Sequence, residues 1–480
     1  MAQTYLHGAE TIEINTGSSL IQVVKSSVIF LIGIAPTGPV NTPTLVTNPT
    51  NAAQFGSELP GFNIPEALAA IFAQGAGQVV VVNTFDTDTN IAAVAAESIT
   101  LVAGRASLAN APVGLAPVVT TADGATTLVA GTDYTVTPFG VVSVKNRSTS
   151  GGYPDATVLK VSYSRLDAAT VTTAQIVGTV NVTTGARTGA KTVALCFNQF
   201  GFNPKILIAP RYSQLTAVAN ELLAMTTKYR AVALFDAPSS TFVPAALTAR
   251  TGTATLGAFG STSERAQLLF PWLKTTDAAS PTGATKSVPY SAFFAGVISF
   301  VDAEYGYWYS PSNYEIKGVA GTDVQISASF TDATAENQQL NAAGIITVFA
   351  GFGGAIKTWG NRSAAYPTES VPAQFLPVRR TADIIEDSIE LAMFKYADKP
   401  LNYATLDAVR QDVNAFLSTL VGRGAIIDGK CVFLKEDNPV EQLAAGQGVF
   451  SYDFMPPPPF ERFTMKARIN TDYLKKLVAQ

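Results

Sequence analysis

Histidine is almost absent from this chain of 480 residues, in which His7 is the only one. Ser-His-Asp and Cys-His catalysis both require a base that is held rigidly against its nucleophile. His7 lies in an N-terminal stretch whose pattern predicts no rigid element, so the sequence argues against both mechanisms. We expect no catalytic residue in this chain.

Metal-binding side chains are similarly scarce. A site with several histidines is excluded, and two isolated cysteines, Cys196 and Cys431, cannot complete a structural zinc site. We interpret both cysteines as reduced, buried small hydrophobic residues. The sequence therefore predicts no metal site and no cofactor.

Charge and long apolar runs are also limited. Charged residues make up 14% of the chain and hydrophobic residues 47%, with a net charge of −4. So little charge favours association, which predicts a subunit of a larger assembly; an ordinary hydrophobic enzyme is the alternative. No Lys/Arg cluster indicates a nucleic-acid partner. Runs such as SSVIFLIGIAP fall short of the roughly 20 residues of a membrane span, and MAQTYLHGAE lacks a signal-peptide pattern, so we expect no direct membrane insertion.

The stretch GFGGAIKT, residues 351–358, differs from a phosphate-binding loop at one position. A Walker A loop has a glycine directly before its lysine, but Ile356 precedes Lys357 here. The following Trp-Gly-Asn does not predict the helix whose N-terminus would bind phosphate. Asp236, at the end of VALFD, is a weak candidate for holding magnesium. We interpret the glycines as permitting close backbone packing.

Three pairs of acidic residues keep an enzymatic alternative open. They are Asp302 with Glu304, Glu386 with Asp387, and Glu436 with Asp437. Paired carboxylates can perform acid and base catalysis, although neighbouring acidic residues are usually solvated. An α/β enzyme that uses a nucleotide or hydrolyses a substrate, and that oligomerises incidentally, is the alternative function.

Hydrophobic patterning divides the chain into parts. Residues 1–25 read as an extended arm, and residues 26–99 and 196–375 alternate apolar strands with helices, as in an α/β core. Residues 100–195 are rich in Thr, Val and Gly and predict an inserted antiparallel β domain at the periphery. Residues 376–480 predict an α+β C-terminal domain that ends in a C-terminal arm.

Two features are expected inside this last part. The spacing of TADIIEDSIELAMFKYAD and of NYATLDAVRQDVNAFLSTLVGRG predicts two amphipathic helices. Asp428-Gly429, in AIIDGKCVFL, is typical of a type I′ turn and predicts a hairpin at that point.

Several motifs in order give the chain a family resemblance. YWYSPSNYEIKGVAG is followed by QQLNAAGIITV, by GFGG and WGNRS, by LPVRRTADIIEDSIELAMF and by DFMPPPPFERFTMKARINTDYL, with HGAETIEI near the start. This series resembles the contractile tail sheath proteins of bacteriophages and covers most of the chain except the Thr/Val-rich insert. Ser363 stands where threonine is commoner in that family.

The resemblance implies a fold and a function. It implies a subtilisin-like α/β core without protease activity, and subunits that stack as hexameric rings around a tail tube and contract to drive the tube through the host envelope. The implied partners are other copies of the chain, the tail tube protein, and baseplate and tail-terminator proteins. The implied location is the virion tail, with assembly in the host cytoplasm. The sheath of a phage-like bacteriocin or secretion system is an alternative, because these share the same plan.

Both ends of the chain predict strands that leave their own fold. Residues 10–24 alternate like a strand without a neighbouring hairpin partner, and residues 463–469 do so after a stiff proline run. Such strands can complete a neighbouring subunit's sheet by β-augmentation. Pairing within the same chain is the alternative. The residues expected to link subunits are Ile12, Ile14 and Val23 in the N-terminal arm and Phe463, Met465 and Ile469 in the C-terminal arm.

Overall fold

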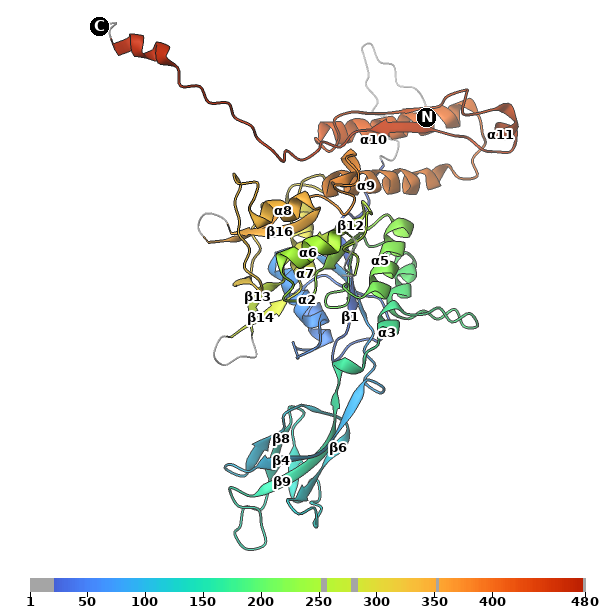
Figure 1. Cartoon of the computed structure of the whole chain (residues 1–480). Helices are drawn as coiled ribbons and strands as arrows, with labels where there is room; N and C mark the ends of the chain where they lie inside the picture. The colour runs from blue at the N-terminus through green and yellow to red at the C-terminus, as the bar shows by residue number, and fades with distance from the viewer. Residues whose placement is uncertain (1–20, 252–256, 278–283, 351–353, 478–480) are drawn as a thin grey trace, which may run out of the picture.

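The structure is a computed structural model that describes residues 21–251, 257–277, 284–350 and 354–477. Figure 1 shows an α/β core in the middle of the molecule, a β module below it and a largely helical C-terminal domain above it. An extended C-terminal segment runs away from this body (Figure 1). The element order therefore produces three stacked parts and one projecting end.

A mostly parallel sheet forms the centre of the core. In the described ranges it has eight strands in the order β17-β16-β12-β11-β10-β1-β3-β2. The edge strands β2 and β17 run antiparallel to their neighbours, whereas the strands between them are parallel. The strands are β1 (Val28–Gly33), β2 (Thr44–Val46), β3 (Gln78–Asn83), β10 (Ile206–Ile208), β11 (Val232–Asp236), β12 (Ala266–Leu269), β16 (Ile345–Ala350) and β17 (Ile356–Trp359). A smaller sheet beside it contains β13 (Leu273–Thr276), β14 (Thr285–Val288) and β15 (Gly321–Thr322).

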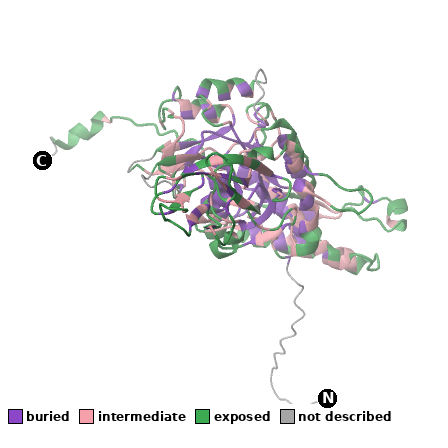
Figure 2. Ribbon diagram, turned by 90° about the horizontal axis from the view of Figure 1, so that it is seen from below, coloured by how far each residue is buried: buried purple, intermediate pink, exposed green. Residues whose placement is uncertain are grey.

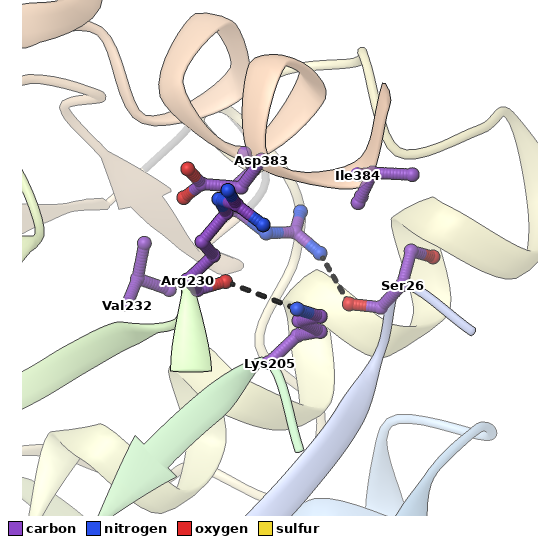
Figure 3. A pocket seen from close by; sticks show the side chains of 7 residues that line it. Ser26, Lys205, Arg230, Val232, Asp383 and Ile384 are labelled. Carbon is purple, nitrogen blue, oxygen red and sulfur yellow. Dashed lines mark hydrogen bonds between the residues drawn. The ribbon is translucent and has the colours of Figure 1, made fainter. Parts of the chain in front are cut away.

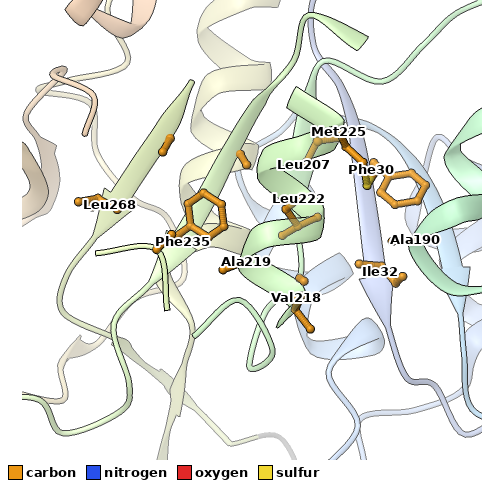
Figure 4. Close-up of a cluster of buried hydrophobic side chains, with 14 of the residues drawn as sticks. Phe30, Ile32, Ala190, Leu207, Val218, Ala219, Leu222, Met225, Phe235 and Leu268 are labelled. Carbon is orange, nitrogen blue, oxygen red and sulfur yellow. The ribbon is translucent and has the colours of Figure 1, made fainter. Parts of the chain in front are cut away.

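Helices cover both faces of the core sheet, because its strands are apolar on both sides. In β1, Phe30 and Ile32 face one layer, where Leu222 and Met225 of α5 meet them (Figure 4), whereas Ile29 faces the other. The first layer contains α3 (Thr173–Val177), η3 (Gly189–Leu195), α4 (Cys196–Phe200), α5 (Thr216–Tyr229), α6 (Val243–Arg250) and α8 (Glu336–Ala342). The second contains α1 (Pro49–Ala52), η1 (Ala53–Phe55), α2 (Ile64–Ala73) and α7 (Tyr290–Glu304). The expected α/β core is therefore present, and a subtilisin-like topology stays a prediction.

The inserted β module begins earlier and ends earlier than residues 100–195. It consists of β4 (Ile91–Thr100), β5 (Arg105–Ser107), β6 (Pro112–Thr121), β7 (Tyr134–Val136), β8 (Val141–Val144) and β9 (Val158–Leu166), which form the antiparallel sheets β4-β9-β6 and β5-β8-β7. After η2 (Ala168–Thr170) the chain returns to the core, where Ile176 and Val193 are buried. The predicted boundaries differ from these because the Thr-rich residues 168–195 contain short helices at the core, on either side of an exposed loop at 179–186, and the alanine-rich start of β4 reads poorly as a strand.

The C-terminal domain contains both expected helices, α9 (Leu376–Met393) and α10 (Tyr403–Gly422). They pack with β18 (Gly429–Val432) and β19 (Ser451–Phe454) around a cluster that includes Ile385, Val413, Phe416, Leu417 and Cys431. Short elements complete it: η4 (Pro372–Gln374), η5 (Phe394–Tyr396), α11 (Val440–Ala444) and, at the far end, η6 (Thr471–Leu477).

The predicted hairpin turn at Asp428-Gly429 is wrong. Gly429 starts β18, whose antiparallel partner is β19, beyond α11. The Met455 N–H donates to the Asp428 carbonyl at 3.1 Å, so the chain runs onward along β19 at this point instead of reversing. Pairing between distant segments has overridden the local turn preference.

Candidate functional site: the terminal arms and the C-terminal sheet

The glycine stretch at 351–354 joins two antiparallel strands. β16 ends at Ala350 and β17 begins at Ile356, and Lys357 lies opposite Phe349 in the resulting pair. Residues 351–353 lie outside the described residues. The Lys357 Nζ donates to Asn313 Oδ1 at 3.2 Å. A strand therefore follows the glycines where a phosphate-binding loop has a helix, and the nucleotide interpretation loses its support.

Asp236 has a structural role. It is fully buried at the end of β11, where it accepts hydrogen bonds from the Ser291 N–H at 2.7 Å and the Ser291 hydroxyl at 2.5 Å. These bonds satisfy the first turn of α7. Burial raises the pKa of Asp236 to about 7. Across the described ranges, no three His, Cys, Asp or Glu side chains are grouped so that they could hold a metal ion.

The acidic pairs do not converge on one site. Glu304 is exposed, and Glu436 and Asp437 lie in an exposed loop. Asp302 and the pair Glu386-Asp387 instead bind basic side chains at the junction of the core with α9. Among the described residues, the three pairs thus supply structural ion pairs and surface charge.

That junction is an ionic seam along α9. Lys205, Arg230 and Arg265 precede the neighbouring strands β10, β11 and β12, and their side chains meet acidic residues on one face of α9. Arg230 lies 3.1 Å from Glu386, 2.9 Å from Asp387 and 2.6 Å from Glu390; Lys205 binds Asp387, and Arg265 binds Asp383. Burial raises the pKa of Asp383, an effect that Arg379 and Arg265 oppose.

Deeper in the seam, charges are almost completely buried. The Arg380 guanidinium donates to Asp302 at 2.9 and 2.6 Å, and only 3% and 2% of these side chains is exposed. Figure 3 shows the surroundings, where Arg380 also donates to the Ser26 carbonyl at 3.1 Å and Lys205 donates to the Arg230 carbonyl. The seam thus joins the amino ends of four core strands to the C-terminal domain.

The predicted N-terminal arm is only partly described. Ile12 and Ile14 lie outside the described residues. Val23 packs against the hydrophobic cluster of the C-terminal domain of its own chain, beside the buried Ile21. The neighbouring Val24 N–H donates to the Ser388 hydroxyl of α9 at 3.1 Å. Val23 therefore packs on its own molecule, where its apolar side chain is partly buried. Any free N-terminal arm is limited to residues before Ile21.

The C-terminal arm, residues 455–470, leaves the molecule. The structure describes it throughout, and it forms no helix or strand in its own chain. Phe463, Met465 and Ile469 are 70%, 90% and 96% exposed, and Figures 1 and 2 show the segment running outward. In this structure Phe463, Met465 and Ile469 therefore do not pair with another strand of the same chain.

The root of this arm is anchored by a residue that the sequence patterns did not single out. The Arg362 Nε donates to Glu461 Oε1 at 2.9 Å, and its guanidinium stacks 3.7 Å from the centre of the Tyr366 ring. Bidentate pairing of this kind fixes direction as well as distance. The only sequence signal was the presence of Arg362 in the TWGNRS motif.

The sheet of the C-terminal domain is small. As far as the chain is described it consists of β18 and β19 alone, which pack on the cluster between α9 and α10. Two strands form a marginal sheet, and an outer edge with unpaired main-chain groups can accept another strand. On β18 the main-chain groups of Cys431 are already hydrogen-bonded to the Asn414 amide. Of the helices in the described ranges, none combines the length and apolar character that crossing a membrane requires.

The core, the ionic seam, the projecting arm and the two-stranded sheet together define a structural subunit that is built to be linked to other chains. The family model for the phage tail sheath protein central domain matches residues 185–364, and that for the phage tail sheath C-terminal domain matches residues 371–470. The tail sheath protein of Burkholderia phage BcepMu is 40% identical over 479 residues, which cover 99% of each chain. The chain therefore belongs to the phage tail sheath protein family.

Other relatives agree in sequence and in fold. The tail sheath protein of Escherichia phage P2 is 26% identical over 64% of this chain and 73% of its own length. The sheath complex of the extracellular contractile injection system PVC, in its contracted state, has a TM-score of 0.59 at 14% identity and covers 98% of this chain and 100% of its own. The contracted helical sheath of the anti-feeding prophage has a TM-score of 0.58 at 16% identity, over 97% and 100%. These two structures show the shared fold.

Proposed function

We propose that this chain polymerises as stacked hexameric rings into a contractile sheath around a tail tube, and that contraction drives the tube through the host envelope. The observation that carries the proposal is the C-terminal arm, which is anchored at Glu461 and then presents Phe463, Met465 and Ile469 to solvent. An apolar segment exposed in this way is unfavourable in a monomer and gains cover in an assembly. Membership of the tail sheath family supports the same conclusion.

The linkage is a strand exchange. Arms from neighbouring copies extend the small C-terminal sheets, so that main-chain hydrogen bonds provide attachment and alternate side chains set the register. Residues 462–470, beyond the contact of Glu461 with Arg362, let subunits change their relative orientation while they stay linked. Tail tube, baseplate and tail-terminator proteins are the other partners, the virion tail is the location, and the host cytoplasm is the site of assembly.

Contraction then needs no nucleotide and no enzymatic site in this chain. Assembly traps the subunits in an extended lattice of higher free energy, which relaxes to a lattice that buries more surface between subunits. At about 25 cal/mol per Å² of apolar surface, about 100 Å² of additional contact per subunit stabilises the contracted lattice by about 2.5 kcal/mol, repeated in every copy. A subtilisin-like topology of the core, without protease activity, belongs to the same proposal. The sheath of a phage-like bacteriocin or secretion system would work in the same way.

The test compares tubes made by the full chain with those made by truncated chains. Purified full-length protein should form tubes in negative-stain micrographs, whereas a chain ending at residue 460 should stay folded by circular dichroism and form none. A matched control removes the β module instead. The Asp167 N–H donates to the Asn90 carbonyl at 3.1 Å, so these residues can be joined directly, and we expect this variant to keep forming tubes. A full-length chain that is strictly monomeric at high concentration would contradict the proposal, and tubes from the truncated chain would contradict the arm linkage.

A further inference from the structure

Between α3 and η3 the chain leaves the core as a narrow hairpin, residues 179–187, which we call the finger; Figure 1 shows it projecting beside α3. Its two sides are joined by hydrogen bonds from the Thr188 N–H to the Thr179 carbonyl at 3.0 Å and from the Asn181 N–H to the Ala186 carbonyl at 2.8 Å. The Asn181 side chain also accepts from two N–H groups of the turn, at 2.9 and 3.0 Å. These bonds give the finger a defined shape, although nearly all of it is exposed.

The root of the finger is built for a close approach of its two sides. Gly178 and Gly189 lie there with φ of +74° and +55°, and a Cβ on Gly178 would lie 1.8 Å from the Thr188 carbonyl oxygen. Glycine is therefore required at this point. The Gly189 N–H donates to Asn41 Oδ1 at 2.8 Å, which fixes the root to the loop between β1 and β2.

One face of the finger combines apolar side chains with a single charge. Val180 lies opposite Arg187 in an antiparallel bridge, so the two side chains share a face. Val182 follows in the turn and is 98% exposed. Arg187 is the only charged residue of the finger sequence TVNVTTGAR. The finger thus presents two valines and one cation to any surface that it meets.

A groove of about 480 Å³ lies in the other layer of the core, between α1, η1 and α2. Its walls are mostly apolar, and Ala52 and Phe72 on these walls pack against the second hydrophobic layer. Among the described residues that line the groove, Glu58 alone is charged. Glu58 binds Lys286 of β14. Since each carboxylate oxygen can accept more than one hydrogen bond, Glu58 can bind a second cation as well.

We propose that this groove receives the finger of a second copy, a contact that rests on the proposed function and does not involve the terminal arms. The surfaces match in character, because Val180 and Val182 meet apolar walls while Arg187 meets Glu58. A chain cannot fill its own groove. The finger leaves the layer that contains α3 and α5, the groove lies in the layer that contains α2 and α7, and the core sheet separates them.

A contact between two different faces orders the copies head to tail. Each copy gives its finger to one neighbour and receives a finger from another, so the contact repeats until it closes into a ring or continues as a helix. A stack of rings requires this kind of contact. The finger and the groove therefore add a direct link between core domains to the link that the arms provide.

Disulfide trapping in assembled tubes tests the contact. In a background in which alanine replaces both cysteines, Val182→Cys is combined with Ala69→Cys or with Ala73→Cys, two exposed positions of α2 in the groove. The matched control combines Val182→Cys with Ala245→Cys, an exposed alanine of α6 in the layer of the finger itself. Tubes are verified by negative stain, oxidised and separated on a non-reducing gel. A disulfide requires Cα atoms within about 7 Å, so it forms only if the tip of the finger enters the groove.

We expect a ladder of covalent oligomers beyond the dimer from at least one groove pair and none from the control pair. Verified tubes that give no ladder from either groove pair, or that give one from the Ala245 pair, would overturn the contact and leave the proposed function intact. A product that stops at the dimer after complete oxidation would show a two-fold contact and would overturn the head-to-tail order. Failure of the unmodified protein to form tubes would refute the proposed function itself.

A charge at the tip of the finger gives an independent measurement that needs no cysteine. Val182→Asp should leave the chain folded by circular dichroism, because this side chain is 98% exposed. It should raise the protein concentration required for tube formation at least about tenfold, because it places an unpaired charge in an apolar groove. Val129→Asp, at a 59% exposed position in the β module, is the matched control and should leave that concentration unchanged. An unchanged concentration for Val182→Asp would overturn the contact, including where a double cysteine variant does not assemble.

Discussion

Removing one partner of the buried Arg380–Asp302 pair should detach the C-terminal domain from the core. These two side chains are 3% and 2% exposed and are joined by two hydrogen bonds, so Arg380→Met leaves a carboxylate that neither water nor another cation solvates fully. Breaking a buried pair in this way typically destabilises by about 3–5 kcal/mol. We expect Arg380→Met and Asp302→Asn each to lower the free energy of unfolding of this junction by that amount.

The assay is urea denaturation followed by intrinsic fluorescence, to which Trp308 contributes from its position against the C-terminal cluster. Two comparisons make the test specific. Arg380→Met combined with Asp302→Leu should recover most of the loss, because replacing both charges removes the unpaired one. Asp407→Ala should have little effect, at most about 1 kcal/mol, because it breaks a surface pair with Arg410. Single replacements that cost less than about 1 kcal/mol, or a double replacement as costly as their sum, would refute the reasoning.

Three further results are expected. Because burial raises the pKa of Asp236 to about 7, the folded chain holds this proton more tightly than the unfolded chain; its free energy of unfolding should fall as pH rises from about 4 to about 7, and Asp236→Asn should flatten this slope in denaturation at several pH values. Arg362→Ala should speed tryptic cleavage at Arg462, as followed by mass spectrometry, whereas Arg410→Ala should not; an unchanged rate would mean that the contact with Glu461 does not hold the arm. Lys357→Ala should leave tube formation unchanged, and calorimetry should detect no saturable ATP binding that this substitution removes. A saturable ATP signal in the unmodified chain that is lost in Lys357→Ala would restore the enzyme interpretation.

The sequence was most informative where one physical constraint dominates. The run VIFLIG becomes β1 with every residue buried, as continuous apolar runs predict for parallel strands covered on both faces. The helices α9 and α10 followed from apolar spacing for a similar reason, since each must bury one stripe. Local patterns failed where distant segments decide the outcome. Gly429 entered a strand because β19 pairs with it, and the contact between Arg362 and Glu461 joins positions that no short motif connects.

The arrangement of rigid and unpacked parts suggests where motion between subunits is concentrated. Arms that add to a sheet are held by main-chain hydrogen bonds worth about 0.5–1.5 kcal/mol each, and residues 455–460 leading to them are spaced by prolines. The seam along α9 instead contains a buried pair whose disruption costs about 3–5 kcal/mol, surrounded by further ion pairs of Arg230 and Arg265. A load applied to the sheet of β18 and β19 should therefore reach the core through α9 before the domain separates. Reorientation should occur in the arm beyond Glu461, while core and C-terminal domain turn together.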